Sequence, residues 1–313
     1  MNQLQNKKEP NGVLVVYKHK GVTSHDIVNG VRRLYHTKRV GHTGTLDPMA
    51  TGVLVVLVGR AAKASEYLVS DTKHYRAVMR LGLTTDSEDI TGTVLSTSSE
   101  LPSQDDVIKA CEKFCGTISQ VPPMYSALKV GGQKLVNLAR QGIVVERKAR
   151  EVVISSLFCE PGILPSDYIL DIVCSSGTYI RTLCSDIGNV LGCGAVMAEL
   201  ERLETGGFSV ENSHTIDELE EKNILELEKL LIPTESLFST LPTVCLPPFY
   251  EKLFRSGCEI YQKKIGTSFV DDMKLRVCKA DGTFFALGKV REYENGSAIK
   301  SIKIFELDSR NSL

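Results

Sequence analysis

The sequence has no hydrophobic run long enough to cross a membrane. Its longest uninterrupted aliphatic stretch covers residues 53–58, whereas a transmembrane helix needs about 20 apolar residues. The first ten residues are polar and have no apolar segment of the kind found in secretory signals. Nine cysteines are scattered without one C-x-x-C pair, so neither a zinc ribbon nor a disulfide framework is indicated. We therefore expect a reduced, cytoplasmic chain with no membrane partner.

The sequence also lacks the glycine-rich loops that hold nucleotides. It contains no G-x-x-x-x-G-K-[ST] loop, and no G-x-G-x-x-G turn follows the first predicted strand at residues 12–17. Its His, Cys, Asp and Glu residues show no metal-ligand spacing. The sequence therefore predicts no cofactor and no metal.

The sequence has almost no net charge, because 37 basic and 38 acidic residues give a formal net charge of −1. The charges are unevenly distributed along the chain. Residues 18–80 hold eleven Lys and Arg against four Asp and Glu, and residues 129–150 hold six against one, whereas residues 199–235 hold three against eleven. Such blocks fit one positive face for a polyanionic partner, and they fit solvated charge on ordinary helices equally well.

Hydrophobic periodicity predicts an α+β chain in which strands and helices mix without a regular βαβ rhythm. Strands are expected at residues 12–17, 53–58, 73–83, 150–159 and 168–174, and helices at residues 24–35, 61–68, 103–115, 133–141, 180–191 and 215–231. Beyond the prolines at 242 and 247–248, short β-rich runs separated by glycines predict a small β-barrel of about 70 residues.

The most informative segment is the loop G-H-T-G-T-L-D-P-M-A-T-G at residues 41–52. Loops of this length inside a compact domain are usually functional. The loop holds one carboxylate, Asp47, and the proline that follows biases Asp47 away from helical geometry. Taken alone, an Asp-Pro pair favours a turn in which the carboxylate bonds its own backbone.

The loop resembles the active-site motif of the TruB-type tRNA pseudouridine synthases, G-H-T-G-x-L-D-P-x-A-x-G. Further segments resemble that family in the expected order: K-H-Y-R with L-G-x-x-T-D, P-P-M-Y-S-A-L-K, S-G-T-Y-I-R, and L-G-C-G with L-x-R-L, within residues 73–86, 122–129, 176–181 and 191–203. The resemblance covers residues 11–208. One departure is Y-K-H at residues 17–19, where the family has D-K-P, so only Lys18 is shared there.

The resemblance implies a mixed, mainly antiparallel catalytic domain over residues 11–236, preceded by a flexible segment at residues 1–10. It also implies a small PUA-like RNA-binding barrel over residues 242–313. The implied reaction converts uridine to pseudouridine at position 55 in the T-arm of tRNA, which requires no metal, redox cofactor or ATP. We expect a monomer, because the sequence shows no coiled coil.

Three residues receive chemical roles through the resemblance. Asp47 would be the nucleophile, attacking either the sugar or the base of a flipped-out nucleotide. Arg181 would keep it ionised, because an opposite charge within ~4–6 Å opposes the effect of burial. Tyr75 would stack on the target base and could act as an acid or base. From the residues alone, Arg181 would be a surface helix residue and Tyr75 a core residue.

Four further residues are expected to contact the substrate. Tyr179 and Leu200 would line the uracil pocket, and His42 would occupy the space left by the flipped base. Lys18 is the fourth residue of this set. A lone histidine such as His42 is also compatible with a purely structural role. Two other functions compete with this interpretation: a non-catalytic RNA-binding or tRNA-folding factor on the same fold, and an aspartate-dependent hydrolase of small molecules.

Overall fold

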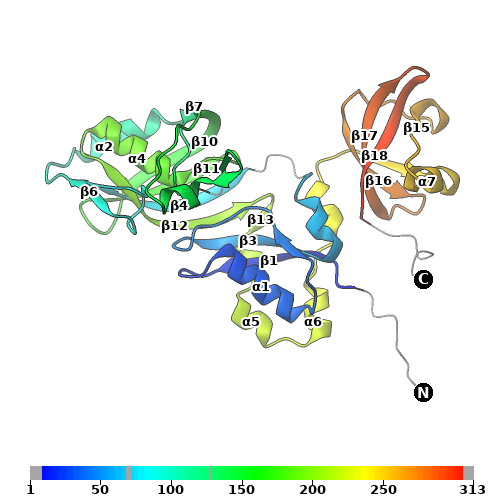
Figure 1. The fold of residues 1–313 in the computed structure, drawn as a ribbon, viewed down its shortest axis with the longest axis horizontal. Coiled ribbons are helices and arrows are strands. Elements are labelled where there is room, and N and C mark those ends of the chain that lie inside the picture. Colours follow the sequence, from blue (N-terminus) through cyan, green and yellow to red (C-terminus); the bar gives the residue numbers. More distant parts are fainter. Residues whose placement is uncertain (1–8, 68–71, 127, 306–313) are drawn as a thin grey trace.

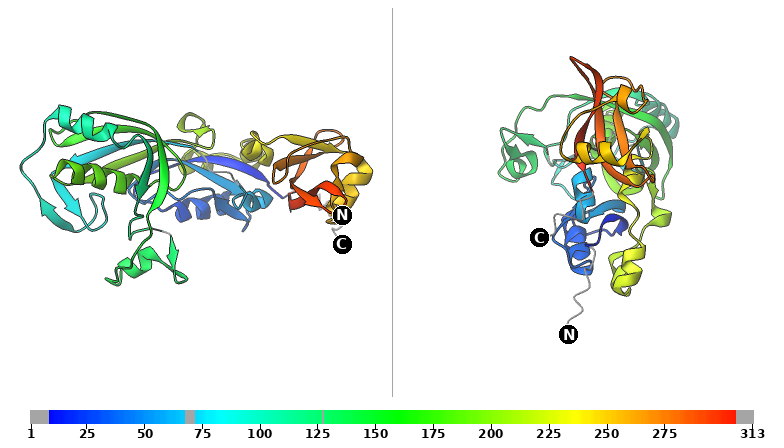
Figure 2. Two further views of the ribbon diagram at one scale, coloured as in Figure 1. Left: turned by 90° about the horizontal axis from the view of Figure 1, so that it is seen from above. Right: turned by 90° about the vertical axis from the view of Figure 1, so that its right-hand side faces the viewer.

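The computed structural model describes residues 9–67, 72–126 and 128–305 of the 313-residue chain. Within these residues, two main sheets lie one after the other along an elongated molecule (Figures 1 and 2). The first sheet contains nine strands and the second contains five. The expected α+β class is confirmed, whereas the predicted flexible head falls largely outside the described residues.

The first sheet runs in the order β1 (Gly12–Lys18), β3 (Thr51–Val58), β12 (Ala195–Thr205), β4 (Lys73–Leu81), β11 (Asp167–Cys174), β10 (Arg150–Pro161) and β7 (Gly116–Gln120), with β2 (Val40–His42) beside β3 and β13 (Phe208–Ser209) beside β12. Its strand pairs are antiparallel except one. The exception joins β3 to β12 over two paired positions, Thr51 with Glu201 and Gly52 with Arg202. This short junction divides the sheet into an N-terminal part (β1, β2, β3) and a central part (β12, β4, β11, β10, β7).

The N-terminal part packs against helix α1 (Ser24–Leu34). Thr23 and Asp26 form a capping box that satisfies backbone donors at the start of this helix. Apolar side chains of α1 at helical spacing, including Ile27 and Val31, meet Leu14 and Val56 of the strands. Two short helices, α5 (Ile216–Glu220) and α6 (Ile224–Lys229), close the same core.

The central part buries one face under helices α2 (Gln104–Glu112) and α4 (Ile180–Leu191). Strand β4 alternates as a half-buried strand should, with Tyr75, Ala77 and Met79 facing this core. Gly192 ends α4 with a left-handed φ of 76°, a conformation that glycine adopts without steric cost.

A lobe at residues 121–149 projects from the central part (Figure 2). It contains β8 (Lys129–Val130), β9 (Gln133–Lys134) and α3 (Leu135–Ala139), packed on a small core of Met124, Leu135 and Leu138. A separate hairpin pairs β5 (Leu83–Thr85) with β6 (Val94–Thr97). We refer to residues 121–149 as the basic lobe, because most of the cations of residues 129–150 belong to it.

The second sheet is curled and runs in the order β14 (Thr243–Leu246), β16 (Lys274–Lys279), β17 (Phe284–Tyr293), β18 (Gly296–Ile304) and β15 (Ile260–Tyr261), with helix α7 (Pro248–Arg255) packed against it. The pair β14–β16 is parallel and the others are antiparallel. The expected β-rich C-terminal unit is therefore present as a half-barrel. Its PUA-like character and the domain boundaries stay predictions.

Several elements differ from the sequence-based expectation. Strand β12 lies at the centre of the first sheet, yet no strand was expected at residues 195–205. The helix expected at residues 61–68 is a 3-10 helix, η1 (Gly59–Ala64), and residue 68 lies outside the described residues. Further 3-10 helices are η2 (Val210–Asn212), η3 (Thr234–Phe238) and η4 (Gln262–Lys264). In the described part of the chain, no helix has the length and apolarity to traverse a bilayer.

Candidate active site

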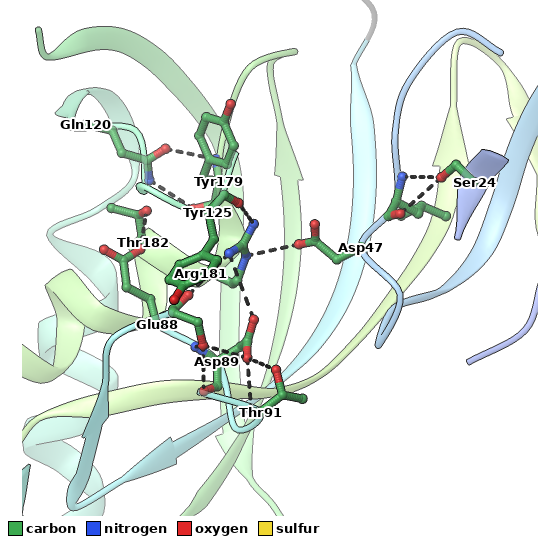
Figure 3. Close-up of polar contacts among 12 residues, drawn as sticks. Ser24, Asp47, Glu88, Asp89, Thr91, Gln120, Tyr125, Tyr179, Arg181 and Thr182 are labelled. Atoms are coloured by element: carbon green, nitrogen blue, oxygen red, sulfur yellow. Dashed lines mark hydrogen bonds and ion pairs between the residues drawn. The ribbon is translucent and has the colours of Figure 1, made fainter. Parts of the chain in front are cut away.

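The loop at residues 41–52 is fixed by backbone hydrogen bonds on both sides of Asp47. The Ser24 hydroxyl accepts from the backbone N–H of Leu46 at 2.9 Å and donates to its carbonyl at 3.0 Å (Figure 3). The carbonyl of Pro48 accepts from the backbone N–H of Gly21 at 2.8 Å. Asp47 therefore sits on a backbone that is held in one place, as a catalytic side chain requires.

Asp47 extends from this loop toward Arg181 at the start of α4 (Figure 3). The Nε of Arg181 lies 3.0 Å from Oδ2 of Asp47, and the two side chains are 6% and 35% exposed. The structure thus pairs this carboxylate with a guanidinium across the fold and places Arg181 in the interior. The interpretation of Arg181 as a surface residue is wrong.

Arg181 is held by several acceptors besides Asp47. Its Nη2 donates to the backbone carbonyl of Tyr125 at 2.8 Å, and its Nη1 donates to that of Ser87 at 3.2 Å. The same Nη1 lies 3.9 Å from Oδ2 of Asp89, whose side chain is 8% exposed. These contacts fix the plane of the guanidinium, so its Nε–H points at Asp47.

Burial and charge act in opposite directions on Asp47. Burial raises the pKa of Asp47, whereas the charges of Arg181 and Lys18 lower it and the charge of Asp89 raises it further. The net pKa lies above the ordinary carboxyl value. Arg181 therefore offsets the cost of burying this carboxylate only in part.

The turn at residues 87–91 packs beside the Asp47–Arg181 ion pair and is held by its own hydrogen bonds. Asp89 accepts hydrogen bonds from the Ser87 hydroxyl at 2.9 Å and from the Thr91 hydroxyl and backbone N–H at 2.6 and 2.9 Å. Glu88 has a positive φ of 63° and accepts from the Thr182 hydroxyl at 2.6 Å. The turn is thereby tied to the first turn of α4, next to Arg181.

Tyr75 and Leu200 lie in the core that adjoins the loop. Both belong to the apolar cluster that also contains Leu46 and Met49 of the loop. Tyr75 is 6% exposed and Leu200 is 9% exposed. Burial raises the pKa of the Tyr75 phenol, so the phenol is neutral at physiological pH. The structure brings both residues to the site from adjacent strands, β4 and β12.

A cavity of about 620 Å³ lies over β4, β11 and β12, beside the end of the loop at residues 41–52. Its walls include Met49, Thr51, Ala77 and Leu200, while Asp47 lies outside its lining. Ligand-binding cavities in proteins typically measure about 300–1,000 Å³. The cavity is therefore large enough for a nucleotide base with its sugar.

Tyr179 directly precedes α4, and its backbone is anchored by a residue that the sequence did not single out. The side-chain amide of Gln120 accepts from the Tyr179 N–H at 2.8 Å and donates to its carbonyl at 3.1 Å (Figure 3). Gln120 is 2% exposed and ends β7. The ring of Tyr179 stands near Arg181 in this view.

His42 ends β2, one residue before the loop turns toward Asp47. Burial and the nearby Arg202 charge lower the pKa of His42, which favours the neutral imidazole. Its Nδ1 is buried and has no hydrogen-bond partner among the described residues. An unpaired buried nitrogen of this kind is uncommon in purely structural histidines.

Lys18 does not reach the surface. The residue is 0% exposed, and its Nζ donates to the carbonyls of His19, Val22 and Pro48 at 3.0, 2.9 and 3.3 Å. Burial lowers its pKa to about 8. In this structure the ammonium group supports the loop beside Asp47, and a contact of Lys18 with substrate stays a prediction.

Asp89, Gln120, Ser24 and Arg202 are the site residues that sequence reasoning missed. Each is an ordinary polar residue in its own segment, and only the fold brings it to the loop. Arg202 lies within the L-x-R-L segment, which was the one available signal. Among the described residues, no group of three or more His, Cys, Asp and Glu could hold a metal ion.

Solved structures show how this fold compares with known ones. The chain is similar to a protein in the crystal structure of a Cbf5-Nop10-Gar1 complex, with a TM-score of 0.72, 25% identity, and coverage of 94% of this chain and 85% of that one. An H/ACA RNP bound to a substrate RNA containing 2′-deoxyuridine gives a TM-score of 0.70 at 23% identity, covering 95% and 85%. The second likeness concerns the fold alone.

Sequence comparisons identify relatives that match nearly the whole chain. The chain is 41% identical to tRNA pseudouridine synthase B of Clostridium kluyveri over 295 residues, which is 94% of this chain and 99% of that protein. The Clostridium perfringens protein of the same name is 42% identical over 299 residues, 95% and 100% of the two chains. Models of the TruB family pseudouridylate synthase N-terminal domain and of the tRNA pseudouridylate synthase B C-terminal domain match residues 32–180 and 181–239. The chain belongs to the TruB family of pseudouridylate synthases.

Proposed function

We propose that this chain converts the uridine at position 55 in the T-arm of tRNA to pseudouridine, with Asp47 as the nucleophile. The observation that supports the proposal most strongly is the ion pair between Asp47 and Arg181, whose Oδ2 and Nε atoms lie 3.0 Å apart. The family relationship supplies the reaction, which isomerises uridine in tRNA. What we propose beyond the family relationship is the position of the target uridine in the T-arm and the role of each site residue.

In the proposed reaction the target nucleotide leaves its stack and enters the site beside Asp47 and Tyr75. Extruding a base costs a few kcal/mol, which stacking on an aromatic ring, about 1–3 kcal/mol per base, can offset. Tyr75 is the proposed stacking partner, and Leu200 and Tyr179 complete the walls. His42 would fill the space that the base leaves in the RNA.

Asp47 then attacks the nucleotide in its ionised form. Arg181 favours that form, because its guanidinium is fixed 3.0 Å from the carboxylate. The C1′–N1 bond breaks, the uracil turns and C5 bonds to C1′, and the bond between the Asp47 carboxylate and the nucleotide is broken again. C5 then loses its proton and N1 gains one, so the reaction is an isomerisation. Tyr75 is the proposed acid or base, because it lies in the same buried cluster as the loop residues next to Asp47.

The RNA itself would be held by the basic lobe and the C-terminal half-barrel. Exposed cations of the lobe and the strand that follows it are Lys129, Lys134, Arg140, Lys148 and Arg150. Each phosphate contact releases counterions, so affinity for tRNA should fall steeply with salt. The carbonyl of Tyr125 in this lobe accepts from Arg181, which links the proposed RNA-binding surface to the site. We propose that the chain acts as a monomer in the cytoplasm.

The test compares the unchanged chain with Asp47→Asn on a tRNA transcript, with pseudouridine read by chemical labelling or mass. We expect the variant to lose pseudouridine formation by at least ~10³-fold while keeping its affinity for tRNA. A transcript with cytidine at position 55 should acquire no pseudouridine. Asp105→Asn, at an exposed helix start, serves as the matched control.

Each outcome separates the competing functions. Unchanged activity in Asp47→Asn would refute the nucleophile, and pseudouridine at other uridines with none at position 55 would refute the T-arm site. A chain that binds tRNA without forming pseudouridine would be a tRNA-folding factor. Binding that does not respond to salt would instead favour a small-molecule hydrolase.

A further inference from the structure

Arg202 is fully buried at the junction between β3 and β12, and it holds the loop at residues 41–52 near both ends. Its Nε–H donates to the carbonyl of Val53 at 2.8 Å, and its Nη2–H donates to that of Gly44 at 3.1 Å. Its backbone lies against Gly52, where a Cβ would come within 2.2 Å of the Arg202 carbonyl oxygen. This close approach requires glycine at position 52.

The remaining nitrogen of the guanidinium, Nη1, is buried and forms no well-aligned hydrogen bond with any described residue. A buried donor without an acceptor costs about 1–3 kcal/mol, so such atoms are rare in native structures. Nη1 lies 3.6 Å from the point where a Cβ of Gly44 would stand, and Lys73 Nζ lies 3.7 Å from the same point. The unused donor therefore faces the inner side of the active-site loop.

Tyr75 is the neighbour of Arg202 across the sheet. The two residues are paired in the ladder between β12 and β4, and the side chains of directly paired residues lie on the same face of a sheet. The Arg202 guanidinium lowers the pKa of the Tyr75 phenol by charge and hydrogen bonding, against the larger effect of burial. The phenol is therefore close enough for the guanidinium charge to act on it.

We propose that Arg202 is a positioning residue for Tyr75: Nη1–H donates to the phenol oxygen when substrate is bound and thereby directs the phenol O–H toward the target base. The proposal rests on the proposed contact of Tyr75 with that base. Catalytic hydrogen bonds are often long or poorly aligned in the free enzyme and tighten in the complex. Because the same guanidinium donates to the carbonyls of Gly44 and Val53, it would fix the position of the phenol relative to the loop that carries Asp47.

A different use of Nη1 would be a direct bond to an RNA phosphate. The geometry favours the phenol, because Arg202 is 0% exposed and lies directly opposite Tyr75, whereas a phosphate would need the covering atoms to move. The two uses predict different kinetics. A residue that orients Tyr75 affects the rate of the bound complex, whereas a phosphate contact affects tRNA affinity.

The experiment measures single-turnover pseudouridine formation at saturating enzyme, together with tRNA affinity, for Arg202→Met and Arg202→Lys. We expect Arg202→Met to lower the plateau rate by roughly 10–100-fold with tRNA affinity within about threefold. Arg202→Lys, which keeps the charge and loses the forked geometry, should recover part of the rate. Arg33→Met removes a guanidinium that pairs with Glu220 outside the site and the proposed RNA-binding surfaces, and should leave the plateau rate unchanged.

The decisive readouts use Tyr75. In a Tyr75→Phe background, Arg202→Met should lower the residual rate by less than about threefold, because coupled residues are not additive. The alkaline limb of the pH–rate profile should move to higher pH in Arg202→Met, since the loss of the guanidinium raises the pKa of the phenol. If Arg202 has a purely structural role, Arg202→Met should lower the rate equally in the wild-type and Tyr75→Phe backgrounds, and the alkaline limb of the pH–rate profile should not move.

Three results would overturn the proposal: an unchanged plateau rate with weakened tRNA affinity, equal losses with and without the phenol, or a wild-type rate in Arg202→Met. Arg202→Lys decides the case if Arg202→Met does not fold, by the same comparison in both backgrounds. If the unchanged chain forms no pseudouridine, the proposed function itself fails. A wild-type rate in the variant refutes the assignment of Arg202 alone.

Discussion

Replacing Arg181 with lysine should impair the enzyme severely although it conserves the charge. The guanidinium spreads its donors over the Asp47 carboxylate at 3.0 Å and two backbone carbonyls at 2.8 and 3.2 Å, with Asp89 at 3.9 Å. A lysine ammonium is a point charge and cannot satisfy acceptors that lie on different sides of a planar fork.

The magnitude follows from the acceptors left without donors. Leaving a buried acceptor unpaired costs about 1–3 kcal/mol, so the loss of two carbonyl bonds should destabilise the fold by about 2–6 kcal/mol. Activity should fall by ~10²-fold or more, because a displacement of ~1 Å at a reacting group has an effect of that size.

Single-turnover pseudouridine formation at saturating enzyme measures the rate, and thermal unfolding followed by circular dichroism measures the stability. Arg255→Lys, at a buried arginine remote from the site, is the control that should lose stability and keep the rate. A rate for Arg181→Lys within about threefold of the unchanged chain, at equal tRNA affinity, would show that the forked contacts do not position Asp47.

Two further predictions concern pH and packing. Burial raises the pKa of Asp47 above its ordinary value of 3.8, and the proposed reaction needs the ionised carboxylate. Single-turnover activity should therefore fall as the pH drops through that raised pKa. An acid limb of the pH–rate profile with its midpoint at or below 3.8 would contradict this prediction. Gly52→Ala should destabilise the chain by roughly 3 kcal/mol or more and reduce activity, because the new Cβ would clash with the backbone of Arg202 while φ stays at +101°. Gly207→Ala has a φ of +79° with nothing within 4 Å and should cost only about 1 kcal/mol, so equal losses of thermal stability in the two variants would refute the packing argument.

Sequence reasoning was most successful where the chemistry lies in one continuous segment. The loop around Asp47 and the segment before Arg181 could be recognised by their own residues, and the structure places the two side chains in contact. Helix α1 and strand β4 were also correctly predicted, because apolar residues at helical spacing and an alternating pattern are local signals.

The errors concern features that depend on the assembled fold. Strand β12 has charged residues at alternate positions, Glu199 and Glu201, which are solvated on the open face of the sheet, and its central place follows only from its partners β3 and β4. Lys18 has the appearance of a surface cation in sequence, because nothing in its segment predicts that three carbonyls will enclose its ammonium group. Asp89 and Gln120 likewise act on residues about 60 to 90 positions away.

The short junction between β3 and β12 makes the catalytic pair sensitive to how the two parts of the sheet are aligned. The loop that carries Asp47 is held by the N-terminal part through Ser24 and Lys18 and by the central core through Leu46 and Met49, while Arg181 belongs to α4 of the central part. Only the positions of Thr51 and Gly52 join these parts by strand pairing. A rotation about that seam would therefore change the distance between the Asp47 carboxylate and the Arg181 guanidinium only if the hydrogen bonds of Arg202 to Gly44 and Val53 and the packing of the loop also changed.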